Sequence, residues 1–508
     1  MLYKRRDFIK ISGITAAGSL MAPSLLQSCK GSALSAGFSN YLDHFEVTPE
    51  LLKKVVKTAM SKGGDYADLY FEHTISNYSN LEDGKVNQAS SSIAYGVGVR
   101  VLKGDQTGYS FTEIITPEAM LKAANTAASI ANETGRTMAE NITEYSAANL
   151  YPVVTSWEDT SVKEKIPFLV RLNEKIFGLD AKVTKVNASI GDTTSYILFY
   201  NSEGLMACDY RPLVYLSGTC VMEQNGRIEN AYVSRSARKG SEFLSNELVD
   251  NLAAEAVEKT NLQFLAGKPR AGEMEVVMSA GESGILLHEA IGHAFEADFN
   301  RKNISIFSDK LNKKVAEDFI TIVDDGTLPY DRGSLNFDDE GSPTQNTVIV
   351  DKGILTSYLH DRISAAYYNV KATGNGRRQS FRYIPVPRMR CTRMDNGPHK
   401  KDEIIASVKN GIYVDSFSNG QVNIGAGDFT FFVKAGYLIE NGKLTMPIKD
   451  INIIGNGPQA LADIVMAADD TKLADGTWTC GKAGQSVPVT MGLPTVKIKK
   501  LVVGGINA

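Results

Sequence analysis

The chain has 508 residues, of which 43% are hydrophobic and 22% are charged, and its formal net charge at pH 7 is −4. This is the composition of an ordinary globular protein, so it excludes a disordered or fibrous chain, and it lacks the basic excess that a nucleic-acid partner would require. The length exceeds what one hydrophobic core usually supports, so we expect two domains of roughly 200 to 250 residues each.

The first residues have the pattern of an export signal. Arg5 and Arg6 precede Asp7 and a moderately apolar run, as in the twin-arginine signals of proteins that are exported already folded. The run ends in "LQSC", which resembles a lipoprotein processing site and would make Cys29 the lipidated first residue of the mature chain. We therefore predict a signal over residues 1–28 and a periplasmic or cell-surface protein held on the membrane by its lipid. A short amphipathic helix is the alternative interpretation.

Residues 29–40 are small and polar, which suits a tether between a lipid anchor and a folded body. After it we expect an N-terminal domain over residues 41–266 that mixes helices and strands. Capped segments with apolar periodicity predict helices over residues 48–60, 116–132, 162–177 and 245–266. Alternating segments predict strands over residues 66–76 and 91–102, and a series of short strands between residues 182 and 236.

The glycine and proline content of residues 267–274, "GKPRAGEM", indicates a domain boundary. A C-terminal domain over residues 267–508 is expected to begin with a strand over residues 274–280 that leads into a helix. Most of the remaining chain reads as strands separated by glycine-containing turns. Helices and strands that neither alternate strictly nor segregate favour the α+β class for both domains.

That helix carries "GILLHEAIGHAFEADF", in which His288 and Glu289 precede a second histidine, His293. In the familiar zinc-hydrolase motif the two histidines are four residues apart, but here they are five apart. In a regular α-helix residues four apart differ in direction by roughly 40°, and residues five apart by about 140°. A single π-type turn reduces the latter angle to about 50°, and Gly292 permits the distortion. We therefore predict a local widening or a break of the helix around residues 290–293, which would let both imidazoles bind one zinc ion.

A catalytic zinc site with an open position for water needs a third protein ligand. Glu296 lies three residues after His293 and is closely tied to the geometry of the same helix, while His360 and His399 lie in polar stretches. Cys480 lies in the turn-rich segment "TWTCGKAGQSVP", where the backbone is free to bring a thiolate to an ion. A buried structural cysteine is the alternative for Cys480.

Besides Cys29 the chain has four cysteines, too few for a disulfide scaffold in a protein of this size. Cys208 and Cys220 could form a disulfide after export. They could equally be buried small hydrophobic residues, and the sequence leaves both possibilities open.

Several segments resemble, in the same order, the TldD branch of the TldD/PmbA metallopeptidase family. They are "LLHEAIGHAFEADFNRK", "GSLNFDDEGSPTQNTVIVDKGIL", "TGNGRRQS", "IIASVKNGIYV", "AGYLIENGKLT", "IIGNGP" and "CGKAGQSVPVTMGLPTVKI". The resemblance covers nearly all of the chain from Leu287 onward, whereas the part before Gly267 resembles the family only in its general plan of helices and strands. The resemblance implies that the family's metal site consists here of His288, His293 and Cys480, with Glu289 beside them.

The PmbA-like branch typically lacks the His-Glu-x-x-x-His element and provides the partner of the active subunit. This chain retains the element and therefore resembles the catalytic member. The resemblance further implies extended, unstructured peptides as substrates, and either a PmbA-like partner subunit or a homo-oligomer. Typical members are cytosolic, so the export signal of this chain departs from the family pattern.

Together these features predict an exported zinc-dependent peptidase with one Zn²⁺ per chain. Two imidazoles and one thiolate leave the zinc with a formal charge of about +1, enough to polarise a water molecule, and Glu289 is expected to act as the general base. An extended peptide could add its backbone to an exposed strand edge beside the metal. The alternative is a catalytically silent, peptide-binding lipoprotein of the same fold.

Overall fold

The computed structural model describes residues 37–505. The predicted signal over residues 1–28, the lipidation site Cys29 and most of the tether lie outside these residues. Within residues 37–505 no helix has both the length and the apolar character needed to cross a bilayer.

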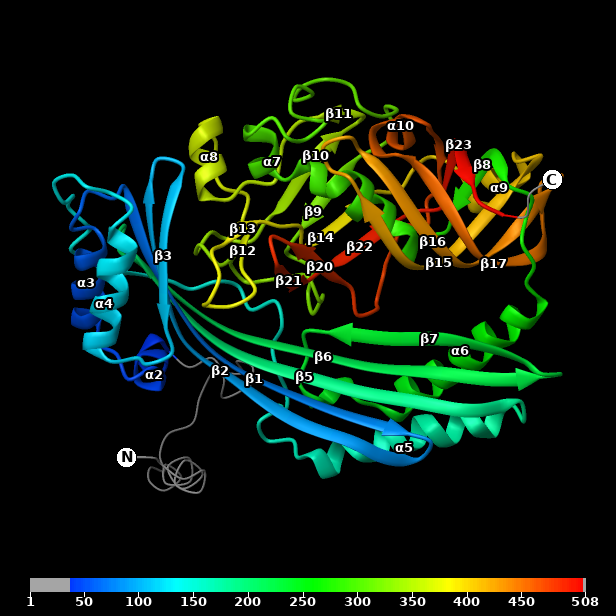
Figure 1. Ribbon diagram of the computed structural model, residues 1–508, viewed down its shortest axis with the longest axis horizontal. Coiled ribbons are helices and arrows are strands. Elements are labelled where there is room, and N and C mark those ends of the chain that lie inside the picture. Colours follow the sequence, from blue (N-terminus) through cyan, green and yellow to red (C-terminus); the bar gives the residue numbers. More distant parts are fainter. Residues whose placement is uncertain (1–36, 506–508) are drawn as a thin grey trace, which may run out of the picture.

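The N-terminal half is built on a seven-stranded sheet with the order β3-β2-β1-β5-β6-β4, in which β7 pairs with β6. Its strands are β1 Tyr66–Glu82, β2 Lys85–Lys103, β3 Gln106–Thr112, β4 Thr143–Tyr145, β5 Val183–Asn201, β6 Leu205–Gln224 and β7 Arg227–Ala237. Figure 1 shows the long strands of this sheet running along one side of the molecule, with the C-terminal half above them.

The series of short strands predicted between residues 182 and 236 is wrong, because this region forms three long strands. β5 has 19 residues, β6 has 20 and β7 has 11. The turns between them occupy residues 202–204 and 225–226, but the polar and glycine residues inside the strands do not interrupt pairing. Gly191, for example, lies against the ring of Tyr215, and a Cβ at this position would be 2.2 Å from the ring.

Four helices of this half confirm the predicted ones: α3 Pro49–Ala59, α4 Pro117–Ala128, α5 Val162–Leu179 and α6 Asn246–Leu265, with a further short helix α2 Phe38–His44. Thr48 and Thr116 cap α3 and α4 by accepting hydrogen bonds from backbone N–H groups three residues on, and each helix has a proline in its first turn. Helices α3 and α4 lie together at one end of the sheet, and α5 and α6 lie along its other part (Figure 1).

The C-terminal half contains two six-stranded sheets with the orders β17-β16-β15-β8-β23-β18 and β11-β10-β9-β14-β22-β19, and two hairpins, β12–β13 and β20–β21. The strands are β8 Gly272–Met278, β9 Ile322–Asp325, β10 Asn346–Asp351, β11 Ile354–Leu355, β12 Gly376–Arg377, β13 Val386–Pro387, β14 Cys391–Met394, β15 Asn410–Val422, β16 Asp428–Glu440, β17 Lys443–Asn456, β18 Ile464–Ala467, β19 Lys472–Leu473, β20 Thr479–Lys482, β21 Gln485–Pro488, β22 Thr490–Leu493 and β23 Val496–Val503. Its α-helices are short: α7 Ala297–Arg301, α8 Arg362–Tyr368, α9 Lys401–Ala406 and α10 Gly457–Ala462. The α+β class and the strand-rich C-terminal half are therefore confirmed.

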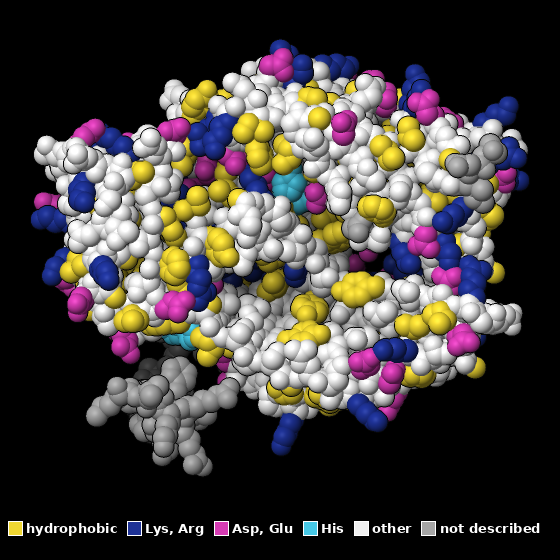
Figure 2. Space-filling view, in the orientation of Figure 1, with side chains coloured by type: hydrophobic (Ala, Val, Ile, Leu, Met, Phe, Trp, Pro, Cys, Tyr) yellow, Lys and Arg dark blue, Asp and Glu magenta, His cyan; other side chains and the backbone are white. Residues whose placement is uncertain are grey.

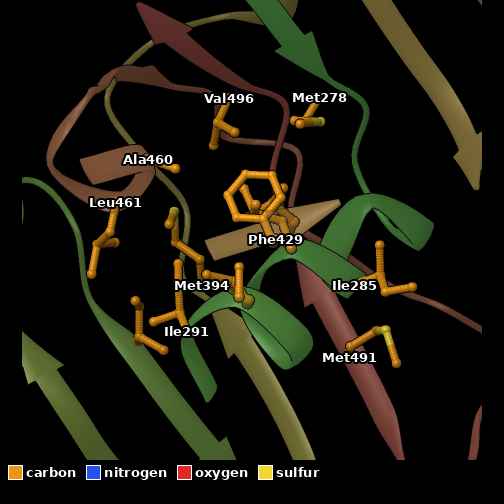
Figure 3. Close-up of a cluster of buried hydrophobic side chains, with 14 of the residues drawn as sticks. Met278, Ile285, Ile291, Met394, Phe429, Ala460, Leu461, Met491 and Val496 are labelled. Carbon is orange, nitrogen blue, oxygen red and sulfur yellow. The ribbon is translucent and has the colours of Figure 1, made fainter. Parts of the chain in front are cut away.

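The helical segment with the two histidines crosses the hydrophobic core of this half. Figure 3 shows Ile285 and Ile291 of that segment among buried side chains from several strands and from α10, including Phe429 and Leu461. Helix α10 also packs closely against the histidine-bearing segment. A Cβ at Gly457, the first residue of α10, would be 2.0 Å from the carbonyl oxygen of Ala290. The core therefore positions the segment along its length.

All four cysteines within residues 37–505 carry free thiols, so the structure contains no disulfide between Cys208 and Cys220.

The two halves are joined by a buried network of charged side chains. Arg100 of β2 donates hydrogen bonds to Asp68 of β1 and to Glu340 of the C-terminal half, and all three side chains are almost fully buried. In a second group Arg211 of β6 pairs with Asp209 and with Asp339 at distances of 2.7 and 2.6 Å. Because a buried charge without its partner is strongly unfavourable, these contacts hold the halves in one arrangement.

Removing one centre of this network is expected to destabilise the fold. Arg100→Met removes the closest counter-charge of two buried carboxylates, Asp68 and Glu340, and should lower the free energy of unfolding by about 3–5 kcal/mol. Lys103→Met is the matched control on the same strand, since Lys103 pairs with Asp65 and Glu133 near the surface and its loss should cost at most about 1 kcal/mol. Urea unfolding followed by circular dichroism measures both, and equal losses would contradict the structural role of Arg100.

Candidate metal centre

The segment that carries the two histidines is a π-helix, Leu286–Gly292 (η3), followed by a 3₁₀ turn, His293–Phe295 (η4). This confirms the predicted widening. The backbone N–H of His293 donates to the carbonyl oxygen of His288, five residues earlier. Gly292 is needed here because a Cβ would be 2.2 Å from Sδ of Met389 and 2.8 Å from the carbonyl oxygen of Leu287.

The π-helix and the β20–β21 hairpin bring His288, His293 and Cys480 together. Their donor atoms all lie within 4.8 Å of one another, although Cys480 follows His293 by 187 positions. The Cys480 Sγ lies 3.5 Å from His293 Nε2, and the two imidazole rings are 5.0 Å apart at an angle of 78°. All three side chains are buried, with exposed fractions of 1%, 4% and 0%.

His288 supplies a direct test of whether these residues fit a metal. Both of its ring nitrogens are buried and have no hydrogen-bond partner within the described residues. A buried polar group without a partner is costly, and native proteins rarely contain one without a reason. Coordination would satisfy one of these nitrogens. Two imidazole nitrogens and one thiolate are ligands that suit zinc, and three protein ligands leave a fourth position open.

The charges around Cys480 favour its thiolate, the form that binds metals. Burial alone would raise the pKa of the Cys480 thiol, but the neighbouring His288 and His293 hold that pKa well below its ordinary value.

Glu296 is a positioning residue and not a member of the donor cluster. Its Oε2 lies 2.9 Å from His293 Nδ1. Burial raises the pKa of Glu296, but Lys482 and His293 outweigh it and lower the pKa to about 2. Since the resulting carboxylate can only accept, Nδ1 of His293 carries a proton and donates it to Glu296, and Nε2 is the ring nitrogen that faces Cys480.

Lys482, two residues after Cys480, connects the β20–β21 hairpin to Glu296. Its Nζ donates to Glu296 Oε2 at 2.9 Å, to Asp298 at 2.7 Å and to the carbonyl oxygen of Pro387. The sequence reasoning missed Lys482. No local signal could have revealed it, because its carboxylate partners Glu296 and Asp298 precede it by 186 and 184 positions.

Glu289 is the most accessible residue of the motif. Its side chain is 25% exposed, and its Oε2 lies 3.9 Å from His293 Nε2. Glu289 therefore lies beside the donor cluster while remaining open to water. Figure 2 shows a histidine side chain near the middle of this face of the molecule, over the C-terminal half, with acidic side chains close to it.

The two other candidate histidines lie elsewhere. His360 is buried against Tyr358 and Tyr368, and burial lowers its pKa to about 4. His399 Nδ1 lies 3.1 Å from the carbonyl oxygen of Ala467. Among residues 37–505 the cluster of His288, His293 and Cys480 is the only group of three or more such side chains that could hold a metal ion.

Comparison with known proteins gives matches to three domain models of one family. Residues 67–131 match PmbA/TldA metallopeptidase domain 1, residues 155–264 match its central domain, and residues 271–505 match its C-terminal domain.

Individual relatives and solved structures agree with these matches. The chain is 40% identical to "Metalloprotease TldD homolog" of Haemophilus influenzae, over 87% of this chain and 93% of that protein. It is 28% identical to "Zinc metalloprotease TldD homolog" of Saccharolobus solfataricus, over 89% of this chain and 99% of that one. The crystal structure of TldE from Thermococcus kodakarensis has the same fold, with a TM-score of 0.70 and 18% identity, over 90% of this chain and 100% of that chain.

If Cys480 is a ligand, its removal should weaken zinc binding. We expect Cys480→Ser to lower the zinc affinity by more than about 100-fold, because losing a ligand exceeds the 10–100-fold cost of losing an outer-shell partner. Cys391→Ser is the matched control, since Cys391 is also buried but donates to Asp331 and lies outside the donor cluster.

Competition with a chromophoric chelator gives the affinities. In the unaltered protein, zinc should also protect Cys480 from alkylation, and chelation should remove that protection. A Cys480→Ser protein with full zinc affinity would exclude Cys480 as a ligand.

Proposed function

The chain belongs to the PmbA/TldD metallopeptidase family, and we propose that it is a peptidase that uses one zinc ion held by His288, His293 and Cys480. The observation that carries this proposal is the buried cluster of three donors in which both ring nitrogens of His288 have no hydrogen-bond partner. The printed name of the Saccharolobus relative, a zinc metalloprotease, supports the choice of metal.

Zinc bound at such a site would polarise a water molecule and lower its pKa towards neutral. The protein itself orients the metal-binding side chains. Glu296 holds the imidazole of His293 through Nδ1, and Lys482 in turn holds Glu296. Because these contacts exist in the folded protein, the donors need not be rearranged when a ligand binds.

Glu289 acts as the general base in this proposal. Its carboxylate is not needed as a ligand, since three donors are already present, and it remains accessible to water. It would accept a proton from the attacking water at Oε2 and deliver that proton to the amine of the departing peptide. A carboxylate next to a metal-binding histidine is suited to this role because both groups are fixed by the same turn of helix.

Extended or unfolded peptides are the proposed substrates. Strands β20 and β21, which carry and support Cys480, pair only with each other within the described residues. Along β21, the N–H of Ser486 already donates to Gln379 and the carbonyl oxygen of Pro488 accepts from Arg377. The outer edge of β20 is therefore the one to which an extended peptide could add as a further strand. Such binding reads the backbone and not the side chains, so it favours unfolded chains over folded ones.

The working assembly is proposed to contain a partner, either a PmbA-like subunit or a second copy of this chain. This part of the proposal rests on the family resemblance, in which a PmbA-like chain is the partner of the active subunit. No nucleic acid is expected as a partner, in keeping with the formal net charge of −4.

Export and lipid anchoring complete the proposal. They rest on Arg5, Arg6 and the segment ending at Cys29, which lie before the described residues. On this basis the catalytic body stands in the periplasm or at the cell surface, joined to the membrane through the tether over residues 29–40.

The rival proposal is a catalytically silent, peptide-binding lipoprotein of the same fold. A pure binding protein has no need of a carboxylate beside a preformed donor cluster, and Glu289 therefore favours the peptidase.

Glu289→Gln tests the mechanism. This change should lower kcat/KM on an unstructured peptide by about 10²–10⁴-fold while about one zinc per chain is retained. Glu317→Gln is the control, because Glu317 is half-exposed and pairs with Lys314 on the surface. If Glu289→Gln kept substantial activity, Glu289 would not be the base. If the unaltered protein were no more active than Glu289→Gln, the silent binder would be the better description.

The localisation is tested at Cys29. Cys29→Ser removes the residue that would be lipidated, so the protein should move from the membrane fraction to the soluble fraction, and the mass of the mature N-terminus should no longer include lipid. An unprocessed N-terminus together with unchanged membrane association would contradict the lipoprotein proposal.

A further inference from the structure

A small cavity lies where the N-terminal sheet meets the C-terminal half, directly behind the hairpin that carries Cys480. Its volume is about 160 Å³, and strands β1, β5 and β6 form one wall. The opposite wall includes the segment after β12 and residues 486–488 of β21. Six charged residues line it: Arg211, Arg238, Arg377, Arg378, Glu72 and Asp339.

Two of the four arginines form ion pairs in the contacts between the halves, although the Nε of Arg378 has no hydrogen-bond partner among the described residues. Arg211 pairs with Asp209 and Asp339, and Arg378 lies 3.6 Å from Asp68 and donates to the carbonyl oxygen of Asp339. These residues belong to the network that joins the two halves.

Arg238 and Arg377 are different, because neither forms an ion pair with any of residues 37–505. Both are buried, with exposed fractions of 4% and 2%. Arg238 donates only one side-chain hydrogen bond, to the carbonyl oxygen of Pro212 at 3.3 Å, and its Nε has no partner. Arg377 donates to the carbonyl oxygens of Met389 and Pro488. A guanidinium group has five N–H donors, so both retain unused ones.

A buried charge without a counter-charge is unfavourable, and proteins normally pair it or use it to bind a ligand. Burial lowers the pKa of Arg238. Burial also lowers the pKa of Arg377 to about 9, because burial and nearby Arg388 outweigh the opposite effect of Asp339. Across the cavity, Glu72 already accepts from Thr74 and from the backbone of Phe381, and Asp339 accepts from Arg211. The walls of the cavity therefore carry four arginines against two carboxylates, an excess of positive groups.

The cavity is also connected to the metal centre through the β20–β21 hairpin. Val487, which lines the cavity, is the cross-strand partner of Cys480. Directly opposite residues of an antiparallel pair have Cα atoms about 4.5–5.5 Å apart. On the other side, Arg377 donates to the carbonyl oxygen of Met389, whose sulfur packs against Gly292 of the π-helix. A peptide group bound in the cavity would therefore be separated from the donor cluster by about the length of one or two residues.

We propose that this cavity binds the free C-terminal carboxylate of a peptide, with Arg238 and Arg377 as its counter-charges. The volume is that of about five water molecules, which suits a carboxylate and one short residue but not a folded segment. A planar guanidinium matches the two oxygens of a carboxylate. Since the cavity adjoins the Cys480 hairpin, the bond presented to the metal centre lies within a few residues of the peptide's C-terminus. This inference rests on the proposed peptidase function and specifies its substrate end.

The first experiment compares two unstructured peptides of identical sequence, one with a free C-terminal carboxylate and one amidated. We expect the free acid to have a kcat/KM at least about tenfold higher, because amidation removes a charge-assisted hydrogen-bonded pair. Mass spectrometry should place its cleavage near the C-terminus. Equal kcat/KM for the two peptides would overturn the inference and leave the proposed peptidase function intact.

A second measurement does not depend on turnover. Isothermal titration of the Glu289→Gln protein with N-acetyl-dialanine and with its amide should give at least about tenfold tighter binding of the acid. This result would stand even if the protein cleaved no peptide, so failure of the proposed function and failure of this inference are distinguishable. Inorganic phosphate is the third titrant. If it bound as tightly as the peptide acid, the site would be a general anion site, and the assignment to a peptide terminus would be wrong.

Variants at Arg238 connect the preference to the cavity. Arg238→Gln should reduce the ratio of acid to amide affinity towards one, and Arg238→Lys should restore it only in part, because lysine keeps the charge but not the planar fork. Arg136→Gln is the control, since Arg136 pairs with Asp65 at an exposed position. An unchanged ratio in folded Arg238→Gln protein would overturn the inference, and the peptide comparison on the unaltered protein decides the matter if that variant does not fold.

Discussion

The metal centre depends on one backbone hydrogen bond, donated by the N–H of His293 to the carbonyl oxygen of His288. This bond spans five residues and widens the helix by the amount needed to bring the two imidazoles to the same side. A π-helix is less favourable than a regular α-helix, so packing must hold it in place. Gly292 makes room for Met389, Gly457 lets α10 approach the carbonyl of Ala290, and the core shown in Figure 3 surrounds the apolar side chains.

Cys480, the third donor, is positioned by ion pairs and hydrogen bonds. Cys480 lies on a short hairpin, and a two-stranded hairpin alone is only marginally stable. Lys482 joins that hairpin to Glu296 and Asp298, while Arg388 donates to the carbonyl oxygen of Cys480. The same carboxylate of Glu296 orients His293. The buried ion pair of Lys482 with Glu296 therefore connects the hairpin to the helix. A change at this pair would affect both His293 and Cys480.

Sequence reasoning succeeded where the determinants are local. Threonine caps located α3 and α4, and the five-residue spacing with Gly292 predicted the π-type turn. The local sequence made Cys480 one candidate for the third ligand, and the family resemblance selected it, because no local pattern connects it to a histidine 187 positions away. The roles of Lys482 and of Arg238 could not be predicted. The role of Lys482 depends on partners distant in sequence, and that of Arg238 on the lack of an ion-pair partner in the described part of the folded chain. The strand lengths were misjudged because Gly191 packs against a ring and does not interrupt its strand.

The most direct test of the account is zinc K-edge X-ray absorption on the purified protein. The account predicts one sulfur scatterer at about 2.3 Å and two imidazole nitrogens at about 2.0–2.1 Å, with a light scatterer in the remaining position. Replacement of the sulfur signal by nitrogen and oxygen alone, with zinc bound at one per chain, would contradict the central claim that Cys480 joins the two histidines at the metal.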